Sequence, residues 1–224
     1  MVILIPQFLP STFADQIVSD LSGLTWHAGD SSDTAYASQV KQNLELKEQD
    51  SPVAQKYAQL LLQAILTNSE LRSKVFTHKG KFPQFNKYTD GGAYHKHSDS
   101  AFIGSPEIRT DLSVTVFLND PADYDGGELT LEYTSGEVRK VKEDKGTLVC
   151  YPSGLLHSVT PVTRGARYAA ITWLQSFIRS PQQRDLLACM VTLSDRIKKQ
   201  EGISENYTEL ISIQNNLLRM WSEF

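Results

Sequence analysis

Cysteine, histidine and long apolar runs are scarce in this chain of 224 residues. Its two cysteines are too few for a disulfide framework, which favours a reducing, cytoplasmic location, and we expect Cys150 to be a small buried hydrophobic residue. The first ten residues, MVILIPQFLP, have no basic segment and are interrupted by proline, so we expect neither a signal peptide nor a membrane span. A net charge of −4 predicts no electrostatic attraction to nucleic acid.

Residues 1–77 have the apolar spacing of helices with short extended pieces between them. Ser51 followed by Pro52 is typical of a helix start, and the apolar residues after it recur at intervals of three and four. Thr12 and Asp15 have the spacing of a capping box at the start of an earlier helix. We therefore predict that 1–77 is a helical and strand support region packed on a sheet.

Residues 78–178 alternate apolar and polar side chains, which is the period of β-strands. The alternation is clearest over 112–118 and 128–133, and glycine turns separate the runs; Gly126 and Gly127 are best explained by such a turn. Many short strands predict a sandwich or barrel, and a jelly roll is one of the few ways to close eight of them. We therefore predict a mainly β protein with flanking helices and a jelly-roll domain over 78–178.

Residues 179–224 return to helical spacing. Ser180 and Pro181 predict the start of one helix, Gly202 predicts its end, and Ser204 predicts the start of the next. Two amphipathic helices in a hairpin must bury their apolar sides somewhere. The hairpin either covers the sheet or forms a homodimer with a second subunit, and the sequence favours the two equally.

Potential metal ligands alternate in the segment YTDGGAYHKHSDS, residues 88–100. In a strand, residues i and i+2 point to the same face, so His97 and Asp99 would present an imidazole and a carboxylate side by side. His157 lies between two strand-like runs of the same domain and is the best-placed third ligand. Two histidines and one carboxylate are the ligand set of non-haem Fe(II) oxygenases, which leaves three positions of an octahedral metal open.

Arg167 lies ten residues after His157, within the apolar run 166–173. A guanidinium in such a run needs a partner, because an isolated buried charge is very costly. If the oxygenase takes 2-oxoglutarate as its electron donor, Arg167 can bind the far carboxylate of this molecule through two hydrogen bonds. The alternative is an aspartate or glutamate within the protein.

Several segments together resemble one family, the bacterial PKHD-type hydroxylases, which are Fe(II)- and 2-oxoglutarate-dependent dioxygenases of the prolyl 4-hydroxylase-like superfamily. The resemblance is dense over residues 80–180. The segments that carry it are Tyr88-x-x-Gly91-x-x-Tyr94-x-x-His97-x-Asp99, FLNDP at 117–121, YDGGEL at 124–129, YPS at 151–153, LHSVTPVTRGAR at 156–167 and WLQS at 173–176.

The resemblance implies a double-stranded β-helix, which is a jelly roll, together with Fe(II), 2-oxoglutarate, O2 and ascorbate as an auxiliary reductant. Carried over residue by residue, it makes His97, Asp99 and His157 the catalytic iron ligands. It also makes Arg167 the partner of the distal carboxylate of 2-oxoglutarate, with a further contact from Tyr88 or Tyr94. The implied reaction is hydroxylation of an unidentified peptidyl residue, free amino acid or small metabolite, with release of succinate and CO2.

Two other interpretations are weaker. His95 gives the segment HKHSD a likeness to the HxHxD of metallo-β-lactamase-type dizinc hydrolases, but this chain has Ser100 where they continue with histidine, and it lacks helices between its strands. We therefore expect His95 to be a surface histidine. A non-catalytic metal or 2-oxoglutarate sensor, or a cupin-like binding module, is the other alternative. The complete ligand set with Arg167 favours an enzyme.

Overall fold

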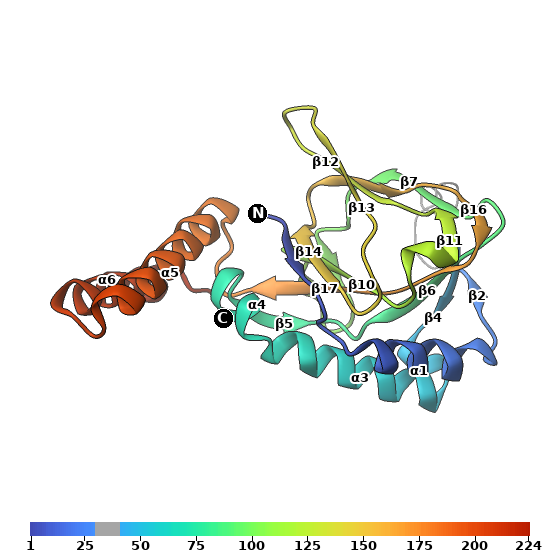
Figure 1. Cartoon of the computed structure of the whole chain (residues 1–224), viewed down its shortest axis with the longest axis horizontal. Coiled ribbons are helices and arrows are strands. Elements are labelled where there is room, and N and C mark those ends of the chain that lie inside the picture. The colour runs from blue at the N-terminus through green and yellow to red at the C-terminus, as the bar shows by residue number, and fades with distance from the viewer. Residues whose placement is uncertain (30–40) are drawn as a thin grey trace.

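The computed structural model describes residues 1–29 and 41–224, and its core is a pair of antiparallel sheets (Figure 1). The larger sheet has eight strands. Seven of them lie side by side in the order β1 (Ile3–Ile5), β14 (Leu148–Pro152), β10 (Leu112–Phe117), β17 (Arg167–Ser176), β6 (Gln84–Tyr88), β4 (Leu44–Leu46) and β2 (His27–Ala28). The eighth, β5 (Thr77–Gly80), also pairs with β17.

The smaller sheet has five strands, in the order β13 (Val138–Val141), β12 (Leu129–Glu132), β15 (Leu156–Val159), β7 (Ala93–His97) and β3 (Lys41–Gln42). Two short ribbons complete the β-structure: β11 (Tyr124–Gly126) with β16 (Val162–Gly165), and β8 (Phe102–Ile103) with β9 (Ile108–Arg109). Every named strand pair is antiparallel. The predicted jelly-roll core with flanking helices is confirmed.

Strand β10 is buried on both faces, although its sequence alternates apolar and polar residues. Leu112, Val114 and Val116 belong to the core cluster that also holds the buried residues of the N-terminal helices. Ser113 and Thr115 point the other way and are also inaccessible to solvent. The polar residues of this strand therefore face the interior of the barrel, where the candidate site lies.

The N-terminal helices α1 (Ser11–Ser22), α3 (Pro52–Thr67) and α4 (Ser69–Lys74) lie against the larger sheet (Figure 1). Two short 3-10 turns, η1 (Glu48–Asp50) and η2 (Pro121–Asp123), join elements. As predicted, Ser51 caps α3 by accepting a hydrogen bond from the Ala54 amide at 3.0 Å. The capping box predicted for α1 is wrong. This helix begins after Pro10 with no side-chain cap, and Asp15 pairs instead with Lys145 at 2.8 Å.

The C-terminal helices α5 (Pro181–Glu201) and α6 (Glu205–Trp221) form a hairpin that projects away from the barrel (Figure 1). Their predicted signals are confirmed: Ser180 and Ser204 accept the capping amide bonds, and Gly202 ends α5 with a φ of 72°. The hairpin does not cover the sheet, and none of the residues of α6 is buried. Within the described ranges, no helix combines the length and apolar character that crossing a membrane requires.

Candidate metal centre and adjoining cavity

A β-bulge in β7 decides which side chains of the segment 88–100 face the interior. His97 pairs with His157 and Tyr94 with Val159 on β15, so two residues of β7 lie opposite the single residue Ser158. The rings of Tyr94 and His97, three positions apart, consequently stack at 3.6 Å with an interplanar angle of 19°. In an unbroken strand His95 would share the face of His97; the bulge turns it to solvent, as expected for a surface histidine.

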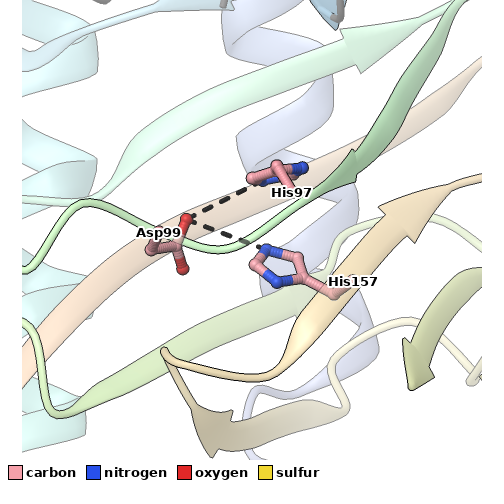
Figure 2. A group of neighbouring side chains, drawn as sticks. All are labelled: His97, Asp99 and His157. Carbon is pink, nitrogen blue, oxygen red and sulfur yellow. Dashed lines mark ion pairs between the residues drawn. The ribbon is translucent and has the colours of Figure 1, made fainter.

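His97, Asp99 and His157 converge inside the barrel (Figure 2). The Nε2 atoms of His97 and His157 lie 3.8 Å and 3.7 Å from Oδ1 of Asp99, and one potential ligand atom from each residue lies within 4.8 Å of the others. One feature differs from the sequence expectation: β7 ends at His97, so Asp99 lies in the following loop. Its amide donates to the Ser153 carbonyl at 3.2 Å, and this contact takes the place of the strand ladder.

Both imidazoles are oriented by a carbonyl two residues earlier in the chain. Nδ1 of His97 lies 2.7 Å from the His95 oxygen, and Nδ1 of His157 lies 2.9 Å from the Leu155 oxygen. A carbonyl only accepts, so each Nδ1 carries the proton and each Nε2 lone pair is directed at Asp99. Nε2 of His97 is buried and has no hydrogen-bond partner among the described residues. Two such nitrogens and a carboxylate oxygen suit a divalent transition metal.

Burial makes His97 a ready ligand. Desolvation, and secondarily the neighbouring His157, lower the pKa of His97 to about 4. Its ring is therefore neutral at physiological pH, which leaves the Nε2 lone pair available for coordination.

Arg167 lies at the start of β17 and is only 1% exposed. Its Nε and Nη1 atoms have no hydrogen-bond partner, and no carboxylate within residues 1–29 and 41–224 forms a salt bridge with it. The guanidinium lies over the rings of Tyr88 and Phe117, with its Cζ atom 5.2 Å and 5.3 Å from the ring centroids. The alternative of an internal acidic partner therefore finds no support in the described residues. A buried guanidinium without a partner among the described residues is suited to bind the carboxylate of a ligand.

Tyr124 is a site residue that sequence reasoning missed. It is fully buried beside Arg167, and its hydroxyl has no partner among the described residues. Burial raises the pKa of Tyr124, while the charge of Arg167 opposes the rise. Gly127 packs against both side chains. A Cβ at this position would lie 2.9 Å from the Tyr124 ring and 3.0 Å from Cδ of Arg167. The glycine makes a turn, with a φ of 66°, and also leaves room for these two side chains.

A cavity joins the three potential ligands to Arg167. Tyr88 and Tyr94 both line it, but only Tyr88 is the direct cross-strand neighbour of Arg167 and has an unpartnered buried hydroxyl. The walls of the cavity are Lys41, Gln84, Asn86, Tyr88, Tyr94, His97, Asp99, Thr115, Leu129, Tyr151, His157, Val159, Arg167, Ile171 and Trp173.

Comparison with known proteins assigns the class and then the family. Residues 83–175 match the model of the 2OG-Fe(II) oxygenase superfamily. A PKHD-type hydroxylase of Paraburkholderia phytofirmans is 40% identical over 207 residues, which cover 91% of this chain and 90% of the relative. A PKHD-type hydroxylase of Bordetella pertussis is 38% identical over 227 residues, and the match covers 100% of both chains. The chain therefore belongs to the PKHD-type hydroxylases, a family of dioxygenase enzymes, rather than to the non-catalytic binding modules.

Solved structures support the fold independently. A Trichoplax adhaerens prolyl hydroxylase, in complex with a peptide fragment of hypoxia inducible factor, matches with a TM-score of 0.58 and 19% identity, over 83% of this chain and 86% of that one. Streptomyces hygroscopicus HygX, with nickel, 2-oxoglutarate and hygromycin B bound, matches with a TM-score of 0.55 and 16% identity, over 79% and 84%. At these identities the likeness shows the shared fold.

Proposed function

We propose that His97, Asp99 and His157 bind Fe(II), and that the protein uses O2 both to hydroxylate a substrate and to convert 2-oxoglutarate into succinate and CO2. One observation carries the proposal: a His–Asp–His group and an unpaired, buried Arg167 share a single cavity. An acidic molecule that chelates a metal at one end and carries a carboxylate at the other satisfies both features, and 2-oxoglutarate is such a molecule.

The residues of the chain divide the work between them. Arg167 binds the distal carboxylate through charge-assisted hydrogen bonds, and the buried hydroxyls of Tyr88 and Tyr124 are available as further donors. The backbone carbonyls behind His97 and His157 fix the orientation of the two rings. When bound, Fe(II) would activate O2 for hydroxylation of a C–H bond, with 2-oxoglutarate as the electron donor. The apolar walls of the cavity exclude water from the reaction.

The substrate is a peptidyl residue, a free amino acid or a small metabolite. The two solved proteins of this fold described above carry a peptide in one case and hygromycin B in the other, so the fold admits both kinds of ligand. Ascorbate as an auxiliary reductant and a cytoplasmic location stay predictions from the sequence.

We also propose a homodimer formed through the C-terminal hairpin. The hairpin projects from the barrel, and its exposed apolar residues include Leu186, Ile203, Ile213 and Met220. Ile203 is 81% exposed and Met220 is 74% exposed, which is a high cost in water for residues of this size.

The proposal is tested by adding Fe(II) and 2-oxoglutarate to the protein without oxygen. We expect a weak metal-to-ligand absorption band in the visible region that Asp99→Ala abolishes, because the substitution removes one of three metal ligands. His95→Ala is the matched control, since His95 is exposed and its carbonyl, which orients His97, is retained. Folded, iron-loaded protein that gives no band would contradict the proposal. A second measurement distinguishes an enzyme from a binding protein. With oxygen present and no substrate added, an enzyme should slowly release succinate, whereas a binding protein should release none.

A further inference from the structure

Two buried serines hold Asp99 on the side away from the imidazoles. Oγ of Ser113 lies 2.5 Å from Oδ2 of Asp99, and Oγ of Ser153 lies 2.7 Å from Oγ of Ser113. Ser113 is 0% exposed and Ser153 is 1% exposed, so water does not compete for these contacts. The two serines belong to different segments, β10 and the turn after β14.

The chemistry of the three groups fixes the direction of the hydrogen bonds. The ionised carboxylate of Asp99 only accepts, so Ser113 donates its single proton to Oδ2. Oγ of Ser113 also has donor geometry toward Oγ of Ser153. Its one proton is therefore divided between Ser153 and Asp99, and the bond to Asp99 is the stronger of the two because it is charge-assisted.

We propose that Ser113 and Ser153 are positioning residues that keep Asp99 a ligand through one oxygen only; the inference rests on the proposed metal site. Oδ2 is engaged by Ser113, whereas Oδ1 is the atom that lies 3.8 Å and 3.7 Å from the two imidazole Nε2 atoms. If Oδ2 were free, the carboxylate could turn and carry Oδ1 away from the two imidazoles. Holding Oδ2 would therefore keep Oδ1 in place as a metal ligand.

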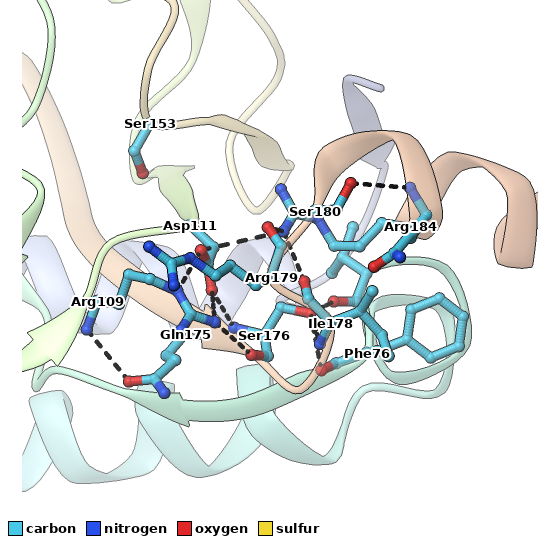
Figure 3. Close-up of polar contacts among 12 residues, drawn as sticks. Phe76, Arg109, Asp111, Ser153, Gln175, Ser176, Ile178, Arg179, Ser180 and Arg184 are labelled. Carbon is cyan, nitrogen blue, oxygen red and sulfur yellow. Dashed lines mark hydrogen bonds and ion pairs between the residues drawn. The ribbon is translucent and has the colours of Figure 1, made fainter. Parts of the chain in front are cut away.

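The backbone of Ser153 supports this role. Its carbonyl accepts the amide of Asp99 at 3.2 Å, and its own amide donates to the Asp111 carbonyl at 3.3 Å. The Asp111 carboxylate is itself fixed by Nε and Nη2 of Arg109, at 2.8 Å and 3.0 Å, and by the Ser176 amide at 2.8 Å (Figure 3). The backbone of Ser153 thus connects the Asp99 loop to a buried polar network.

The test measures Mn(II) affinity by electron paramagnetic resonance titration, which requires no turnover. We expect Ser113→Ala to weaken Mn(II) binding by about 10- to 100-fold, which is typical for loss of a group that orients a metal ligand. Ser194→Ala is the matched control. Ser194 is a buried serine in α5 whose hydroxyl donates only to the Val191 carbonyl, and this variant should bind Mn(II) as the wild type does. The energy of the Fe(II)–2-oxoglutarate absorption band should also shift in Ser113→Ala and not in Ser194→Ala.

The outcomes separate this inference from the proposed function. Wild-type affinity in Ser113→Ala, together with loss of binding in Asp99→Ala, would refute the positioning role and leave the metal site intact. Absence of Mn(II) binding by the wild type would refute both. If Ser113→Ala does not fold, Ser153→Ala takes its place, because it keeps the contact between Ser113 and Asp99. We expect a smaller loss of affinity there, and an unchanged affinity would overturn the inference.

Discussion

Arg167 shows how far a single residue can be interpreted from sequence. Its place in an apolar run indicated a buried charge that needs a carboxylate, but the sequence left open whether the protein supplies that carboxylate itself. The structure leaves two of its nitrogens without partners and brings in a second group, Tyr124, from β11. Tyr124 was hidden because it lies beside Arg167 only in the folded chain, on β11, which pairs with β16, the strand immediately before β17.

Arg167→Leu should raise the KM for 2-oxoglutarate by about 100-fold, because two charge-assisted hydrogen bonds are lost. Mn(II) affinity should not change, since Arg167 does not belong to the ligand group. The melting temperature of the ligand-free protein should stay the same or rise, because the substitution removes an unpaired buried charge. Arg164→Ala is the control: Arg164 is exposed and pairs with Asp125. A marked loss of stability in Arg167→Leu would instead show that contacts within the protein, such as those with the Tyr88 and Phe117 rings, stabilise the buried guanidinium.

Among the elements, β7 differs most from its simplest interpretation. A regular strand would align His95, His97 and Asp99 on one face, as their alternate spacing suggested. The bulge opposite Ser158 breaks the alternation, turns His95 outward and stacks Tyr94 on His97. Strand β10 shows the opposite case, since its alternation is regular and its polar face is nevertheless buried against the site. The alternation of apolar and polar residues therefore predicted where the strands lie, but it did not predict which of their side chains are exposed to solvent.

Helix α5 is attached to the barrel through a buried arginine, Arg184, whose loss should destabilise the protein. Arg184 is 4% exposed and donates through Nη1 to the carbonyls of Ile178 and Arg179, at 2.8 Å and 2.9 Å. Burial lowers the pKa of Arg184, and its guanidinium lies 4.0 Å from Asp111.

Arg184→Met should lower the free energy of unfolding by about 3 kcal/mol, because it leaves buried acceptors unpaired. Urea denaturation measures the loss. Arg196→Met, at an exposed position of the same helix, should change stability by less than about 0.5 kcal/mol. Equal stability of the two variants would show that Arg184 does not anchor the helix.

The division of the chain into 1–77, 78–178 and 179–224 stays a prediction, and limited proteolysis between these segments would test it.

At the scale of the whole molecule, the hairpin of α5 and α6 projects from the barrel. The sequence left two destinations for the apolar sides of α5 and α6. The hairpin does not lie on the sheet, and part of its apolar surface packs in one cluster with Phe76 and Ile178; the members from the two helices are Leu187, Met190, Leu217, Leu218 and Trp221.

The proposed dimer should give a solution mass twice that of the chain in light scattering. Ile213 is 54% exposed on α6, and Ile213→Glu should raise the dissociation constant about tenfold or more by placing a charge in the apolar contact. Asn215→Glu adds the same charge at an exposed polar position of the helix and is the control. A wild-type protein that is monomeric at all concentrations would rule out the dimer.

The sequence by itself predicted a β sandwich or barrel from strand periodicity, and its segments resembling the PKHD-type hydroxylases implied the class, the jelly roll and the three residues proposed to bind iron. These features are carried by local patterns of residue type, which are present before the chain folds. Only the tertiary structure decided that Tyr88 adjoins Arg167, that Tyr124 joins them, and that Ser113 and Ser153 hold Asp99. Each of these is a contact between residues far apart in the chain, and strand register and one bulge set such contacts. The strand register is stabilised by packing throughout the core. A short segment of sequence therefore does not specify it.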